Sequence, residues 1–153
     1  MKIVYYDCRG LPLPAIVAAI RTGRLPRESL KPTDLFNLPL IYCKKAFAPY
    51  GVDERGNEVY ALWCRAEQRL LPRFFQARRK LYREKTRWVL QPVNGIPGAP
   101  LTMLAWRLAR LGCPIGKNLF YRNILKRYTD LLALALHGLD RAKINSIYAG
   151  RRE

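Results

Sequence analysis

The sequence predicts an α/β fold: a small sheet with at least one parallel strand pair and a hairpin, helices on its faces, and extra helices at the C-terminus. Strand-like and helix-like segments alternate through the first part of the chain, a Gly-Asn turn separates two β-rich runs, and later segments are helical. Half of the 153 residues are hydrophobic, enough to bury a core. We therefore expect one domain over 1–153, with a helical part at about 100–150.

The N-terminal segment predicts a strand followed by a helix. The run KIVYY at 2–6 is β-branched and aromatic, as in a buried strand. Pro14 suits the first turn of a helix, where a missing N–H costs nothing, and Gly23 suits the end of that helix. A Pro- and Leu-rich connection over 24–39 follows, with one short helical turn.

A hairpin comes next. The runs LIYCKKAFAPYGV and EVYALWC flank Gly56 and Asn57, which tolerate positive φ in a turn. Residues 66–85 then show helical periodicity, and Pro72 requires this helix either to start near Leu71 or to kink.

The remainder predicts one strand and several helices. Residues 86–93 predict a strand, and a turn-rich loop follows it. Helices are expected at 101–112 and 117–138, each ended by a glycine, with a short last helix after Asp140.

Charge is distributed very unevenly. The chain has 28 Lys and Arg against 11 Asp and Glu, a formal net charge of +17. Residues 61–153 hold 19 of these bases and only 5 of the acids. Such an excess concentrates polyanions near the protein, so we expect nucleic acid or an acidic protein as the partner.

The predicted helix at 66–85 concentrates this charge. Leu70, Phe74, Ala77 and Leu81 form one stripe, with Leu71, Phe75 and Tyr82 beside it. The bases on its other sides, with one that follows the helix, make the predicted polyanion-binding set: Arg69, Arg73, Arg78, Arg79, Lys80, Arg83 and Arg87. The alternative is the solvated face of an ordinary packed helix.

Two observations favour binding over that alternative. Only two acids accompany the bases between 66 and 85, whereas surfaces that serve solubility alone mix the two signs. No nucleic-acid-binding motif is present, so the hypothesis is contact with the phosphate backbone without base specificity.

The loop at 8–14 supports a second hypothesis, a nucleotide- or phosphate-binding, enzyme-like protein. A strand before it and a helix after it are the setting of many phosphate sites. Cys8, Arg9 and Gly10 are the candidate residues, with Cys8 as a possible thiolate nucleophile near a helix N-terminus. The prolines at 12 and 14 argue against it, because they donate no N–H.

Other catalytic or metal chemistry is not predicted, and no cofactor is expected. His137, the single histidine, ends an apolar helix, where a structural role suits it. Four cysteines include no CxxC pair, so buried thiols are expected, and Cys43 and Cys64 can face each other across paired strands.

A third hypothesis is a protein-interaction subunit or homo-oligomer. Leu11, Leu13 and the apolar C-terminal helix would provide its surface. The apolar run LLALAL is far shorter than the roughly 20 residues of a membrane span. We therefore expect a cytoplasmic protein without a transmembrane segment.

The stretches KIVYY, AIVAAIRTGRLP and GVDERGNEVYAL resemble a bacterial family of unknown function, found mostly in endospore-forming Gram-positive bacteria. Its members open with a KIIY strand, a Gly-Gly-x-His-Ser-Ser loop and a helix. The resemblance covers most of the chain and implies an α/β fold without an established activity. Arg9 and Gly10 fall on the family's glycines, Pro12 on its histidine, and Leu13 and Pro14 on its serines. An anion site of that type would therefore have lost its hydroxyls and its imidazole here.

Overall fold

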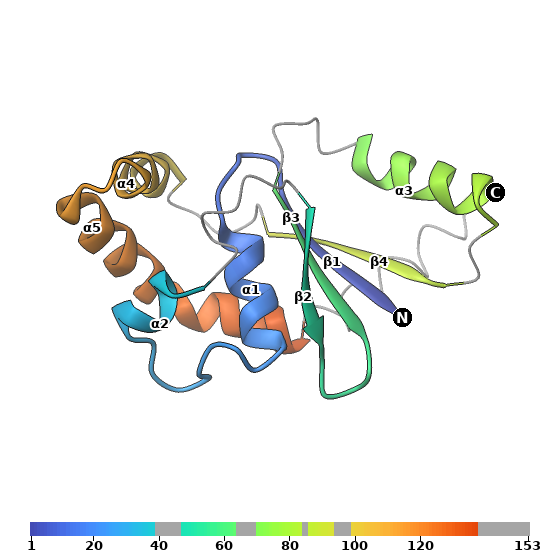
Figure 1. Cartoon of the computed structure of the whole chain (residues 1–153), viewed down its shortest axis with the longest axis horizontal. Coiled ribbons are helices and arrows are strands. Elements are labelled where there is room, and N and C mark those ends of the chain that lie inside the picture. Colours follow the sequence, from blue (N-terminus) through green and yellow to red (C-terminus); the bar gives the residue numbers. More distant parts are fainter. Residues whose placement is uncertain (39–46, 64–69, 84–85, 94–98, 138–153) are drawn as a thin grey trace.

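The computed structural model describes residues 1–38, 47–63, 70–83, 86–93 and 99–137 (Figure 1). Its elements follow in the order β1 (Lys2–Asp7), α1 (Leu13–Arg21), α2 (Pro32–Phe36), β2 (Phe47–Val52), β3 (Glu58–Trp63), α3 (Leu70–Leu81), β4 (Trp88–Pro92), α4 (Ala99–Arg110) and α5 (Pro114–Leu125). A further helical segment spans 128–137.

The four strands form one mixed sheet in the order β2-β3-β1-β4. The central strand β1 is parallel to both β3 and β4, and β2 pairs with β3 as an antiparallel hairpin. The hairpin turn is possible because Gly56 adopts a φ of +75°. The predicted fold class is confirmed, including the parallel pair, the hairpin and the C-terminal helices.

Figure 1 shows α3 on one side of the sheet and α1, α2, α4 and α5 on the other. The chain therefore leaves β1 toward one face and leaves the neighbouring strand β3 toward the opposite face. Connections that diverge in this way, at the carboxyl ends of adjacent parallel strands, form the crevice where open α/β sheets commonly bind ligands. The loop that follows β1 is thus the first place to look for a site.

Strand alternation sends β1 side chains into two separate cores. Ile3 and Tyr5 join the cluster around α1, whereas Val4 and Tyr6 join the cluster beneath α3. Among the described residues, the α1 cluster has 26 buried members and the α3 cluster has five. The two faces of the sheet are therefore covered to very different extents.

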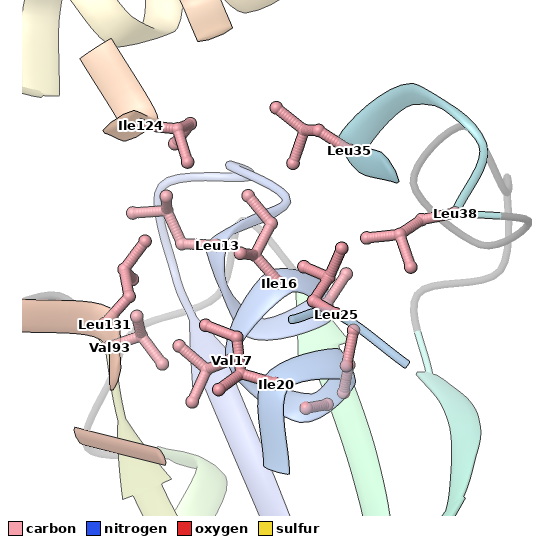
Figure 2. Close-up of a cluster of buried hydrophobic side chains, with 14 of the residues drawn as sticks. Leu13, Ile16, Val17, Ile20, Leu25, Leu35, Leu38, Val93, Ile124 and Leu131 are labelled. Carbon is pink, nitrogen blue, oxygen red and sulfur yellow. The ribbon is translucent and has the colours of Figure 1, made fainter. Parts of the chain in front are cut away.

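Helix α1 is buried on all sides. All nine of its residues are buried, and eight of them are apolar, as expected for a helix whose whole circumference faces a core. Figure 2 shows Ile16, Val17 and Ile20 surrounded by side chains from α2, α5 and the helical segment at 128–137. Gly23, at a φ of +72°, ends the helix as predicted.

Arg21, the last residue of α1, is the buried charge that joins three parts of the chain. Its Nε and Nη2 each lie 2.8 Å from Oδ2 of Asp53, in the hairpin turn. Its Nη1 donates to the carbonyl of Ala135 at 2.5 Å, and the hydroxyl of Tyr5 donates to the same carbonyl at 3.3 Å. The hairpin turn and the C-terminal helical segment are thereby fixed against α1.

Two predicted helices have different bounds in the structure. The helix expected at 66–85 corresponds to α3, which is described over Leu70–Leu81 and ends before the predicted residue 85. Residues 64–69 lie outside the described residues, and with them the choice between a helix start near Leu71 and a kink at Pro72. The helix expected at 117–138 was wrong as one unit, because a turn at 126–127 separates α5 from the segment at 128–137. Helix α5 starts earlier than expected, at Pro114, because proline favours the first helical position. Gly138 and Asp140 lie outside the described residues.

Gly116 sets how closely α5 approaches α4. A Cβ atom at this position would lie 2.4 Å from the Cβ of Leu108 and 2.6 Å from the backbone nitrogen of Ala109.

We expect Gly116→Ala to destabilise the protein by about 1–3 kcal/mol, the usual cost of overpacking. Urea unfolding would measure it. Asn118→Ala, on the exposed side of α5, is the matched control and should change stability by less than about 0.5 kcal/mol. Equal effects of the two substitutions would contradict the close packing.

Asp53 makes stability depend on pH. Burial alone would raise the pKa of its carboxyl, but hydrogen bonds from the Asn57 backbone and amide and from Arg21 outweigh burial and hold the pKa below its ordinary 3.8. Its contribution to stability is therefore complete above about pH 4 and is lost as the pH falls through the lower folded-state pKa. In acid titrations followed by urea unfolding, we expect Asp53→Asn to be less stable at neutral pH and to lose less of its stability on acidification. An unchanged acid dependence would show that this carboxylate does not contribute.

Candidate functional site

The loop after β1 is occupied by its own ion pair. Asp7, at the end of β1, is completely buried. It accepts a hydrogen bond from the backbone N–H of Arg9 at 2.6 Å, and the Arg9 side chain donates to it through Nε at 3.2 Å and Nη2 at 2.8 Å. Arg9 therefore folds back to neutralise Asp7 instead of extending toward a ligand.

The start of α1 offers few donors to an anion. Pro12 is the N-cap and makes no side-chain capping bond, and Pro14 has no N–H. The N–H groups of Ala15 and Ile16 both donate to the carbonyl of Pro12, at 3.0 and 3.3 Å. Among the described residues, Leu13 keeps the one first-turn N–H that is neither missing nor bonded. A phosphate cradle needs several such groups pointing outward.

The loop is also closed on the side that faces the α1 core. Leu11 and Leu13 are buried in the α1 core. The cavity beneath them measures about 10 Å³ and is also lined by Arg9 and Arg127. That volume holds at most one water molecule, so no nucleotide fits there. Cys8, Arg9 and Gly10 lie together in this loop, with Cys8 partly buried against the α3 core.

Helix α3 rests on the sheet through two side chains. Leu71 and Phe75 are buried, and the Phe75 ring lies 5.2 Å from that of Trp88 on β4. The guanidinium of Arg78 also lies 5.2 Å from the Trp88 ring, a cation–π distance. Arg78 is thereby held at the border between α3 and the sheet.

The other bases of the predicted set differ in their placement. Arg73 and Lys80 are exposed on α3, Arg83 is exposed directly after it, and Arg87 is exposed next to β4. Arg69 lies outside the described residues, as does the side chain of Arg79. Arg83 has a φ of +48°, a left-handed conformation that costs a residue with a side chain about 1–2 kcal/mol.

The apolar stripe on α3 lies in solvent, and sequence reasoning did not identify it as a surface. Leu70, Phe74 and Leu81 are 51%, 62% and 76% exposed. Phe74 and Leu81 also line a hollow on the helix surface, together with Ala77, Arg78 and Tyr82. The signal was the presence of two adjacent apolar stripes on one helix, only one of which a sheet can bury.

Acids and bases are segregated along the described chain. Four ion pairs lie within 2–58: Lys2–Glu58, Arg9–Asp7, Arg21–Asp53 and Arg27–Glu54. The described segments from α3 to 137 hold 12 basic residues and a single acid, Asp130. The positive charge of the second half is therefore not neutralised by these segments.

The other reactive side chains stand apart from one another. His137 is exposed at the end of the last described helical segment, and Cys113 is the N-cap of α5. Cys43 and Cys64 lie outside the described residues. Within the part of the chain that the structure describes, no three His, Cys, Asp or Glu side chains are close enough to hold a metal ion. None of the described helices has both the length and the apolar character to cross a membrane.

These features define an α/β protein with a mixed four-stranded sheet, a closed loop after β1 and basic helices after β3. Residues 2–136 match the family model described as a protein of unknown function (DUF3189), and the chain belongs to this family. Neither a curated protein nor a solved structure matches the chain significantly.

The Asp7–Arg9 pair gives a direct test of the loop geometry. Arg9→Met leaves the buried Asp7 carboxylate without its cation, and we expect a loss of about 2–3 kcal/mol in urea unfolding. The loss is smaller than for a completely buried pair because the Arg9 side chain is 24% exposed. Asp7→Asn combined with Arg9→Met should recover at least half of it, since no charge is then left unpaired. No recovery would show that Arg9 stabilises the loop by packing alone.

Proposed function

We propose that the chain is a single α/β domain that binds an anionic macromolecule, without catalysis, through its basic second half. The observation that carries this proposal is the segregation of acids and bases along the described chain. In the first half, four of the seven described bases pair with carboxylates, whereas the described segments from α3 to 137 hold 12 bases and one acid. Unneutralised bases displace the cations condensed on a polyanion, and the release of these cations favours binding.

Helix α3 supplies a row of such bases. Arg73 and Lys80 are seven residues apart, so they project from one side of the helix, about 10 Å from each other along its axis. Both are exposed. Arg83 and Arg87 continue the positive charge beyond the end of α3, and a flexible polyanion can reach all four.

The alternative site, the loop after β1, is less well supported. Its arginine is engaged by Asp7, its first helical turn offers the N–H of Leu13 alone, and its cavity holds no more than a water molecule. The substitutions relative to the Gly-Gly-x-His-Ser-Ser pattern support the same conclusion. Pro12, Leu13 and Pro14 replace polar side chains with groups that close the loop over the core.

The proposal is tested by salt-dependent binding. The probes are a fluorescein-labelled single-stranded oligonucleotide of mixed sequence and labelled polyglutamate, titrated from about 20 to about 300 mM NaCl. We expect affinity for the oligonucleotide to fall steeply with salt. Arg73→Ala with Lys80→Ala should reduce the slope of log K against log salt by about 1.4, since each single-strand phosphate contact contributes about 0.7.

The matched control removes two exposed bases of the first half. Arg27→Ala with Arg55→Ala lowers the net charge equally but should leave the slope unchanged. Arg9→Met should also leave it unchanged, which separates the helical surface from the loop. Absence of binding to both probes at the lowest salt concentration would refute the proposal.

A further inference from the structure

The sheet face under α3 is only partly covered. A four-stranded sheet is about 19 Å wide, and a helix with its side chains is about 10–12 Å across, so full coverage takes about two helices. Within the described residues, this face carries α3 and five buried core residues, against 26 in the α1 core. Phe47, Tyr60, Trp88 and Leu90 remain only partly buried there. The described part of the chain leaves room for a second helix in this layer.

The exposed stripe of α3 lies on a lateral side of the helix. Successive helical residues are about 100° apart, so the stripe of Leu70, Phe74 and Leu81 lies about 100° around the helix from the buried pair of Leu71 and Phe75. It therefore points sideways along the sheet, not toward it or directly away. Neighbouring helices on one face of a sheet contact each other on this side, at interaxial distances of about 8–10 Å.

The spacing of the stripe is that of a helix–helix contact. Leu70, Phe74, Ala77 and Leu81 follow one another at intervals of four, three and four residues. Such a row packs into the grooves of another helix. The hollow lined by Phe74, Ala77, Arg78, Leu81 and Tyr82 adds concavity on the same side.

Charge identifies the chemistry of the occupant. Arg78 borders the stripe on the sheet side, Arg73 and Lys80 border it on the outer side, and the described helix contains no acid. A second copy of the chain would bring the same positive helix. The chain's own residues 138–153 carry four bases and two acids. Opposite charges are favoured across an interface, so the complementary helix has an apolar stripe with Asp or Glu on its flanks.

The position of the bases disfavours a membrane. The side of α3 opposite its buried residues carries Arg73 and Lys80, whereas a helix that inserts into a bilayer needs its apolar side outermost. A nucleic acid fits the bases but has no aliphatic row to match Leu70 and Leu81. The stripe therefore favours a protein over both.

We propose that an acidic amphipathic helix of a partner protein packs along α3 and completes the helical layer on this face of the sheet. The inference rests on the proposed function, because the same bases that attract an anionic macromolecule select the acidic flanks. It adds a hydrophobic contact that a simple polyanion does not make.

The probe is a designed peptide of about 18 residues, with Leu at intervals of four, three and four and Glu on both sides of the Leu row. A scrambled peptide of identical composition and charge is the comparison. Fluorescence anisotropy should show at least tenfold tighter binding of the amphipathic peptide. Phe74→Ser should weaken that binding at least tenfold and leave polyglutamate binding unchanged. Leu104→Ser, at a residue 52% exposed on α4, is the matched control and should have no effect.

Each other result decides against the inference. Equal binding of the two peptides, or no effect of Phe74→Ser, would overturn it. So would Phe74-dependent binding that is tighter to phosphatidylglycerol vesicles or to the oligonucleotide than to the amphipathic peptide. If polyglutamate binds in a salt-dependent way while the peptides do not differ, this inference fails and the proposed function stands. If no polyanion binds, both fail.

Discussion

The buried ion pair between Arg21 and Asp53 is the interaction on which the architecture depends. It fixes the end of α1 to the hairpin turn, and through the carbonyl of Ala135 it fixes both to the C-terminal helical segment. Removing either partner of such a pair leaves a buried charge, which typically costs about 3–5 kcal/mol. Because α1 lies between the sheet and the other helices, loss of this ion pair would disturb the packing of most of the core.

The placement of basic side chains differs between the two halves of the chain. Arg9 and Arg21 are both held by carboxylates, and the N-terminal loop and helix are consequently closed and neutral. The later helices pack through Trp106, Phe120 and Ile124 and keep their bases outside. The second half therefore contributes to the core with its apolar side chains and carries its positive charge on the surface.

Local sequence signals were sufficient to predict an element where the residue type strongly favours one backbone conformation. The β-branched run of β1, Pro14 at the start of α1 and Gly56 in the hairpin turn all predicted what the structure shows. The turn at 126–127 contains no glycine or proline, and the helical periodicity continues across it. The sequence therefore predicted one continuous helix.

Tertiary contacts decided the features that local signals left open. The choice between Phe74 and Phe75 as the buried ring depends on Trp88, a contact that the helix alone does not specify. The engagement of Arg9 by Asp7 likewise requires knowing that Asp7 is buried. The basic residues and the apolar stripe beside them were predictable from composition and spacing, whereas the exposure of that stripe depends on which side of α3 the sheet buries.

The segregation of charge along the described chain has a consequence for how an anionic body would approach the molecule. Helix α3 lies on one side of the sheet, and the basic helices α4 and α5 lie on the other (Figure 1). Positive charge therefore faces two directions, and no single end of the molecule carries it. Screening limits the attraction to about one Debye length, roughly 30 Å at 0.01 M salt. Within that distance the attraction acts from either side, so more of the initial orientations lead to contact and association is faster.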